Sequence, residues 1–478
     1  MTAGASDPRA GLMAAVAGED ARRELRSWLI LAVAALAIAG IFALLVALSR
    51  VPGISSIPLW PTHFFEKGLV IHVAYSFVIW FLCLLAALAT VATYWLDGGE
   101  CRGRATGKTA ATLVGTAQVL MMAPALFLEG EASLNNYVPT LLHPVYYLGL
   151  VFLFLSLLFV VIRLFAAFFR RVRPVTPPVA GILAAGAIYV AAFACLVITF
   201  HTAWGEVAGP EVNERLFWGA GHVLQFVNTA LMAVAWYWLA EAAGRAPSAK
   251  VFTLAMAALA AFALIGPALY AVYPMYGADQ TLAFTNLQYL LAPTPVILAA
   301  ALLAGGRTGA APGPEAALAR RALWVSAGLF FLGGLLGLFV DGADTRTPAH
   351  YHGVIGGVNL ALMGLTFCLL LPLVGRAPAF GRPARALIWL YGVGQALHSL
   401  GLFAAGGYGA PRKVAGEVAG LEALGAQLAL YAMGVGALIA IAGGVMFIWI
   451  AGRCLMRSEA PPATPPATGA GPARQLKI

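Results

Sequence analysis

The sequence predicts an all-helical protein that crosses a membrane twelve times. Of its 478 residues, 61% are hydrophobic and only 10% are charged, and the apolar residues gather in long runs. A soluble protein of ordinary composition has about 25% charged residues. A helix of about 20 apolar residues crosses the hydrocarbon core of a bilayer. The lipid bilayer is therefore the first partner that the sequence predicts.

The predicted spans follow one another with short connections and form one membrane domain over residues 27–457. They are residues 27–49, 68–96, 106–128, 140–163, 177–200, 216–243, 251–274, 284–304, 321–340, 349–374, 384–408 and 422–452. The N-terminal segment 1–26 and the Pro-, Ala- and Thr-rich tail 458–478 are predicted to be disordered.

The distribution of basic residues predicts the orientation. With twelve spans, all but six of the 29 Lys and Arg residues fall on the side of the two termini. Cytoplasmic segments of membrane proteins are enriched in Lys and Arg, so both termini are placed in the cytoplasm of a bacterial-type plasma membrane. The net charge of +9 then reflects topology and not a nucleic-acid partner.

The eight histidines are the side chains best suited to hold a cofactor, and this topology places all of them towards the outer half of the membrane. Ionisable groups inside a bilayer are costly and usually functional. Residues two apart in a helix differ by about 200° around its axis, so His350 and His352 leave their helix on nearly opposite sides. Two flat cofactors fit this geometry better than one metal ion. For His63, His143 and His398 the simpler interpretation is an interhelical hydrogen bond.

Five motifs, in order along the chain, resemble the catalytic subunit I of the haem–copper oxidase superfamily. They are His72 early in the second span, Gly221-His222 in the sixth, Phe284-Thr285 with Ala292-Pro293 in the eighth, His350-Tyr351-His352 in the tenth, and His398-Ser399-Leu400-Gly401-Leu402 with Pro411-Arg412-Lys413 at the eleventh. The resemblance spans most of the twelve helices and implies the bundle of that superfamily.

The resemblance implies two haems. His72 and His352 would be the axial ligands of a low-spin haem, and His350 would bind a high-spin haem that is open on its other side. Arg412 and Lys413 would pair with haem propionates, although a solvated basic loop is the alternative. The implied activity is that of a respiratory oxidoreductase, which takes electrons from a cytochrome c or cupredoxin-type subunit and reduces dioxygen.

The sequence departs from the superfamily pattern at the copper site. One copper ligand would be His222, but the other two histidines fall at Ala268 and Leu269, and Phe226 stands where the helix-6 tyrosine is expected. Tyr270 and Tyr273 could supply a catalytic phenol, or they are aromatic residues of the membrane interface.

An alternative metal site lies at the start of the sixth span. His201 and Glu206, which precede it, could join His222 in a metal site of imidazole and carboxylate. Such ligands suit non-haem iron better than copper, and glutamates near non-haem iron resemble the nitric oxide reductase branch of the superfamily.

Three functions therefore stay open, together with a fourth of another class. The first is dioxygen reduction, with His222, Tyr270, Tyr273 and Glu206 as candidate catalytic residues. The second is nitric oxide reduction, and the third is a non-catalytic di-haem electron-transfer or sensor protein. The fourth is a transporter with histidine-lined helices, against which the apparent lack of inverted repeats and broken helix pairs counts.

Overall fold

The structure is a computed structural model, and it describes residues 8–49, 64–100, 102–135, 137–245, 247–306, 313–340, 342, 344–412 and 423–457. Twelve of its helical segments are long and apolar enough to cross a membrane. Each coincides with a predicted span, so the predicted number and places of the spans are confirmed, although most helices begin or end several residues outside the predicted limits.

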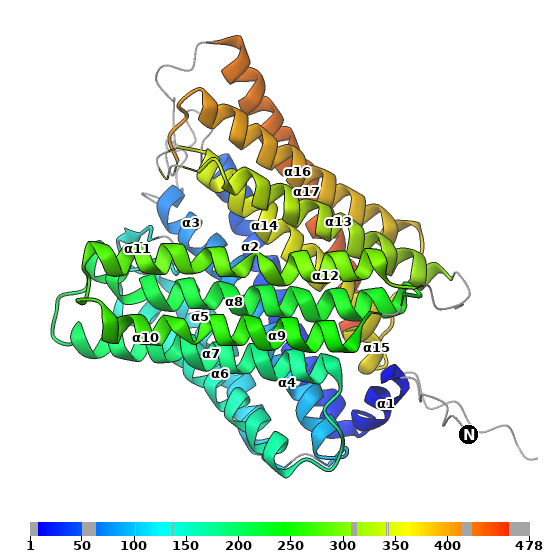
Figure 1. Cartoon of the computed structure of the whole chain (residues 1–478). Helices are drawn as coiled ribbons and strands as arrows, with labels where there is room; N and C mark the ends of the chain where they lie inside the picture. Colours follow the sequence, from blue (N-terminus) through cyan, green and yellow to red (C-terminus); the bar gives the residue numbers. More distant parts are fainter. Residues whose placement is uncertain are drawn as a thin grey trace, which may run out of the picture.

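The helices follow the chain order shown in Figure 1. Eight spans are single helices, of which the first seven are α2 (Glu19–Leu48), α5 (Arg104–Leu126), α6 (Pro144–Arg170), α7 (Pro177–Thr202), α8 (Pro210–Ala242), α13 (Pro314–Gly337) and α16 (Arg382–Gly407). The last span, α17 (Leu424–Met456), is also continuous. A two-stranded antiparallel pair, β1 (Ala132–Ser133) and β2 (Thr140–Leu141), lies between α5 and α6.

Four spans change helix type along their length. These are α3 (Phe64–Val73), η2 (Ala74–Ile79) and α4 (Trp80–Leu96); α9 (Ala249–Ala263) and α10 (Ile265–Val272); α11 (Ala278–Leu287), η3 (Gln288–Leu291) and α12 (Pro293–Ala304); and α14 (Arg346–Leu365), η4 (Thr366–Leu370) and α15 (Leu371–Leu373). The η2 and η4 segments are π-helical and η3 is a 3-10 helix.

Proline explains three of these four interruptions. A proline cannot donate to the carbonyl four residues before it, and its ring clashes with that carbonyl. Four residues before Pro267 is Ala263, where α9 ends, and the corresponding residues for Pro293 and Pro372 lie in η3 and η4. The seventh and eighth spans thus change helix type at Leu264 and Ala292, both of which keep right-handed helical backbone angles. No proline explains η2.

The predicted disorder of segment 1–26 was wrong for residues 8–26. Residues Pro8–Ala15 form α1, and α2 already begins at Glu19. The charges in this segment have partners, which stabilises it: Arg9 pairs with Glu315 at 2.5 Å, and the buried Glu24 pairs with the buried Arg163 of α6. Residues 1–7 and the tail 458–478 lie outside the described residues.

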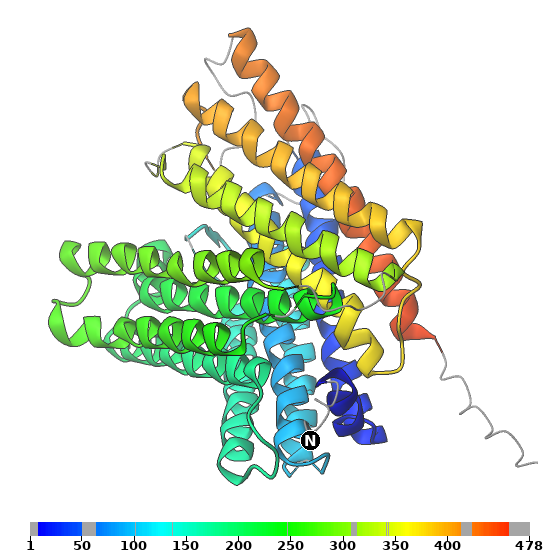
Figure 2. The same cartoon turned by 45° about the vertical axis from the view of Figure 1, so that its right-hand side comes forward.

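Three spans form the interior of the bundle. In the second, sixth and tenth spans, 78%, 94% and 89% of the most apolar stretch is buried, whereas no other span exceeds 56%. Figures 1 and 2 show α8 between α9–α10 and α11–α12, while α13, α14, α16 and α17 form a second group along one edge. These three interior spans are the ones in which His72, His222, His350 and His352 lie.

Glycines allow the second group of helices to pack closely. A Cβ at Gly353 of α14 would lie 2.5 Å from the Cα of Gly333 in α13, and a Cβ at Gly394 of α16 would collide with the backbone of α17 at Ala440. Small residues at helix contacts are typical of membrane bundles, because they let two backbones approach. The carbonyl of Gly333 at this close contact lies 2.8 Å from the Nδ1 atom of His350.

Candidate haem-binding site

His72, His222, His350 and His352 lie in the parts of α3, α8 and α14 nearest the ends where these helices begin; we call this end of the bundle the histidine end. His63 lies outside the described residues. The rings of His352 (α14) and His398 (α16) meet edge to face with their centroids 4.5 Å apart. His352 also interacts electrostatically with His72 of α3. The two histidines predicted to share one haem therefore lie near each other, and His398 joins them.

Each of three histidines is oriented by a backbone carbonyl of a neighbouring helix. The Nδ1 atom of His72 lies 2.9 Å from the carbonyl oxygen of Ala39 in α2, and Nδ1 of His350 lies 2.8 Å from that of Gly333 in α13. His398 has the same contact with Met433 at 2.8 Å. A carbonyl oxygen only accepts hydrogen bonds, so Nδ1 carries the proton and Nε2 keeps its lone pair. Metal-binding histidines are typically oriented in this way.

His350 and His352 face different neighbours, as the helical geometry predicts. The ring of His350 lies against α13, where a Cβ at Gly337 would be 2.5 Å from its Nδ1 atom. The ring of His352 faces α16 and α3 through His398 and His72. The two imidazoles thus leave α14 in directions that would serve two separate groups.

The segment before Arg412 is fixed to the start of α14. Asp344 pairs through the backbone with Pro411, and the Thr345 amide donates to the Ala410 carbonyl at 3.0 Å. The hydrogen bond from Arg346 lowers the pKa of the Asp344 carboxyl, which stays ionised beside it. Arg412 lies close enough to Tyr351 to interact with it electrostatically. Arg412 thus lies near Tyr351, the residue between the two histidines in the sequence of α14, whereas Lys413 lies outside the described residues.

His222 differs from the other histidines because both of its ring nitrogens have partners. Its Nδ1 atom lies 2.7 Å from the carbonyl oxygen of Trp218, and its Nε2 atom lies 3.0 Å from the hydroxyl of Tyr137. The Tyr137 and His222 rings are 4.3 Å apart. Burial, together with the charge of Glu214, raises the pKa of Tyr137, so its hydroxyl keeps its proton. The sequence had not suggested Tyr137, since nothing near it indicates a contact with a residue 85 positions away.

The predicted site of His201, Glu206 and His222 is not formed. His201 is exposed at the end of α7, and the exposed Glu206 forms an ion pair with Arg215. Within the described ranges, no group of three His, Cys, Asp or Glu residues could hold a metal ion. The connection between α7 and α8 presents Glu206 to the surface, where it pairs with Arg215, so the structure does not bring these residues together and the His/Glu metal site stays a prediction.

The two candidate phenols of the seventh span are placed differently. The Tyr270 ring lies 5.3 Å from Phe284, which in turn lies 5.9 Å from His222, and a Cβ at Gly219 would collide with the Tyr270 hydroxyl. Tyr270 is therefore near His222, separated from it by one aromatic ring. Tyr273 is the extended residue that ends α10.

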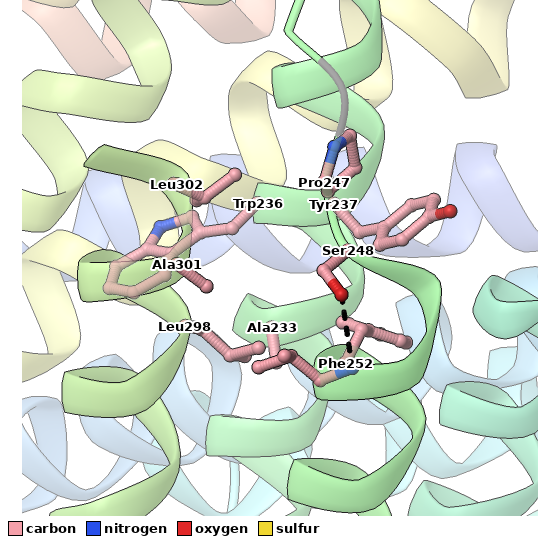
Figure 3. Close-up of a pocket in the computed structure, with 10 residues that line it drawn as sticks. Ala233, Trp236, Tyr237, Pro247, Ser248, Phe252, Leu298, Ala301 and Leu302 are labelled. Carbon is pink, nitrogen blue, oxygen red and sulfur yellow. Dashed lines mark hydrogen bonds between the residues drawn. The ribbon is translucent and has the colours of Figure 1, made fainter. Parts of the chain in front are cut away.

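An apolar pocket between α8, α9 and α12 is distinct from the histidine end. Trp236, Tyr237, Phe252 and Leu298 line it, with Ser248 at its rim (Figure 3). The Ser248 hydroxyl accepts from the Val251 amide at 3.3 Å and caps α9. At a rise of 1.5 Å per residue, Trp236 is about 20 Å along α8 from His222. The pocket lining has no His, Cys, Asp or Glu side chain.

Residues 25–446 match the family model described as Cytochrome C and Quinol oxidase polypeptide I. The chain belongs to this family. The predicted resemblance to subunit I of the haem–copper oxidases is thereby confirmed.

Two curated relatives are similar to this chain over most of their length. An uncharacterised protein of Aquifex aeolicus (strain VF5) is 29% identical over 350 residues, which cover 72% of this chain and 83% of that protein. An uncharacterised protein of Rickettsia prowazekii (strain Madrid E) is 24% identical over 511 residues, covering 90% and 95%. Their names state no activity.

A solved structure has the same fold. It is a cryo-EM structure of a heme-copper terminal oxidase dimer, with a TM-score of 0.74 and 15% sequence identity. The match covers 94% of this chain and 86% of that chain. The predicted all-helical, twelve-span fold of this family is therefore confirmed.

The donor atoms at the histidine end suit haem iron. His72 and His350 each keep an Nε2 lone pair, and no hydrogen bond to either atom is found among the described residues. Imidazole nitrogen is an ordinary axial ligand of haem. The ligands for a third metal do not fit in the same way, because the Nε2 atom of His222 is already hydrogen-bonded.

Proposed function

We propose that this protein is a haem-binding oxidoreductase subunit of the membrane. His72 and His352 would hold a low-spin haem, and His350 would hold a high-spin haem on the other side of α14. The observation that best supports this is the orientation of His72 and His350, whose Nδ1 atoms are bonded to carbonyls of α2 and α13. The two haems, when bound, would supply one-electron transfer and one open iron position for a small gas.

The chain's own residues would hold and orient these groups. Arg412 and Lys413 would pair with propionates, because guanidinium and ammonium groups bind carboxylates strongly. The hydrogen bond from Arg346 keeps Asp344 ionised, and this ion pair fixes the segment that presents Arg412. The electrons would come from a cytochrome c or cupredoxin-type subunit. The predicted topology, with both termini in the cytoplasm, places the haems near the outer face of a bacterial-type plasma membrane.

Dioxygen is the first candidate substrate, because the family model is that of cytochrome c and quinol oxidases. Nitric oxide is the alternative gas. A second candidate function is a di-haem electron-transfer or sensor protein without gas reduction. It is favoured by the contacts of His222, whose two nitrogens are hydrogen-bonded, and by the lack of a three-residue metal site within the described ranges.

Gas consumption by the purified protein, or its native complex, tests these candidates. With a reduced electron donor, we expect dioxygen to be consumed and carbon monoxide to shift the spectrum of one haem. Consumption of nitric oxide alone would favour the reductase. Carbon monoxide binding without consumption of either gas would favour the electron-transfer or sensor function. A purified protein without haem absorption would contradict all three.

A further inference from the structure

We propose that a hydrogen-bonded pair, Tyr137 and His222, replaces the third metal of this family, so that the chain holds no metal besides its haem irons. The inference rests on the proposed function for the presence of the haems. The contacts of His222 themselves do not depend on haem. The family implies a metal at His222, and the structure disagrees for the three reasons that follow.

The first reason is the direction of the hydrogen bonds around His222. The Trp218 carbonyl can only accept, so the proton of the neutral imidazole lies on Nδ1. Nε2 then has a lone pair, to which the Tyr137 hydroxyl donates at 3.0 Å. A metal would need this same lone pair. Because Trp218 lies one turn before His222 in α8, this orientation of the ring requires no other helix.

The second reason is that Tyr137 is held in place by its surroundings. It lies between β1 and β2, and Thr140 of β2 accepts a hydrogen bond from the buried Asn213 of α8 at 2.8 Å. A Cβ at Gly221 would collide with Tyr137, so this glycine makes room for the phenol beside the imidazole. The position of the phenol is thus built into the contact between the β1–β2 segment and α8.

The third reason is that, within the described residues, His222 belongs to no group of three His, Cys, Asp or Glu side chains that could hold a metal ion. The rings around the imidazole belong to Tyr137, Trp218 and Phe284. The nearby Gln288 amide donates to the His222 carbonyl at 3.0 Å, so it is engaged elsewhere. Copper and non-haem iron need several donor side chains for tight binding, and Ala268 and Leu269 supply none.

Metal analysis of the full-length protein tests the proposal first. Cells would be grown with added copper and iron, and metals would be counted by mass spectrometry against haem by the pyridine assay. We expect iron equal to haem and no stoichiometric copper or non-haem iron. The variant His222→Gln should give the same counts. A third metal that His222→Gln removes would overturn the proposal.

Copper titration of three variants tests the role of Tyr137 itself. Tyr137→His places a second imidazole beside His222, and we expect it to bind Cu²⁺ about tenfold tighter than the unchanged protein, or better. Tyr137→Phe exposes Nε2 alone and should give a smaller gain. Adding His222→Gln should abolish both gains, and the matched control Tyr270→Phe should leave copper binding unchanged.

Equal copper affinity in the unchanged protein, Tyr137→Phe and Tyr137→His would overturn the proposal. If Tyr137→His does not fold, as judged by its haem bands and elution volume, the Tyr137→Phe titration and the metal count decide. The two proposals fail differently. A folded protein without haem contradicts the proposed function, whereas a metal at His222 contradicts only the inference about the pair.

Discussion

Two kinds of histidine differ in where their ring is held. His72 and His350 are of one kind, and His222 is of the other. All three bond Nδ1 to a backbone carbonyl, but His72 and His350 use a neighbouring helix whereas His222 uses its own. A carbonyl on another helix orients the ring relative to both helices, so the packing of the two helices would position a bound group. The carbonyl that holds His222 lies one turn back in α8 itself, and the Tyr137 hydroxyl then bonds the Nε2 atom of His222. Whether a histidine of this bundle can bind a metal is therefore decided by the contact of Nε2.

The largest expected effect is the loss of a haem when His72 or His350 is replaced, which should not occur when His222 is replaced. His72→Ala should abolish the low-spin haem bands and leave carbon monoxide binding, whereas His350→Ala should abolish carbon monoxide binding and leave the low-spin bands. Each change removes an axial ligand. The measurement is the reduced and carbon monoxide-difference spectrum per mole of protein. His222→Gln is the control and should retain both haems; loss of both haems there would break the comparison.

A second prediction separates loss of a ligand from loss of stability. At the end of the bundle opposite the histidine end, the carboxylate of Glu24 accepts hydrogen bonds from Arg163, Thr90 and Tyr94. Glu24→Ala leaves the Arg163 charge buried, which costs about 3 kcal/mol. Thermal unfolding in detergent should show this loss, while the ratio of the two haems stays unchanged. A selective loss of one haem would mean that destabilisation alone reproduces the effect of His72→Ala or His350→Ala.

A third prediction concerns the contact between His350 and α13. In Gly337→Ala, the new Cβ would lie 2.5 Å from Nδ1 of His350, so the ring must move. Carbon monoxide binding should fall several-fold while the low-spin bands persist. Gly334→Ala is the matched control, because a Cβ there meets nothing within 4 Å. Equal spectra for the two variants would show that the position of His350 against α13 is unimportant.

The smallest expected effect concerns Tyr137. Tyr137→Phe removes one hydrogen bond to His222 and should lower the free energy of unfolding by about 1 kcal/mol. The double variant with Tyr137→Phe and His222→Gln should lose less free energy of unfolding than the sum of the two single variants, since both changes remove the same bond. Haem content should stay constant throughout. Fully additive losses would indicate that the two side chains act independently.

These contrasts also show what the sequence could predict. The twelve spans follow from apolar length, and the divergence of His350 from His352 follows from helix geometry, so both depend on local sequence. The proximity of His72 to His352 was expected from the order of motifs in the family. The interruption of the seventh span could also have been predicted, because Pro267 cannot bond to the carbonyl four residues before it, at the place where α9 ends.

The features that escaped prediction depend on contacts between distant residues. Tyr137 reaches His222 only after β1 and β2 pair and dock on α8. The helix before residue 27 contains Glu24, which pairs with Arg163, a residue 139 positions away. The prediction of a metal site at Glu206 rested on the closeness of Glu206 to His222 in the sequence. It did not include the ion pair between Glu206 and Arg215 at the surface.

The account depends most on His72, His352 and His350 binding two haems, and electron paramagnetic resonance of the oxidised protein tests this directly. The account predicts one low-spin and one high-spin ferric haem per chain, with the low-spin signal lost in His72→Ala and the high-spin signal lost in His350→Ala. A protein without haem signals, or signals unchanged by both substitutions, would contradict it.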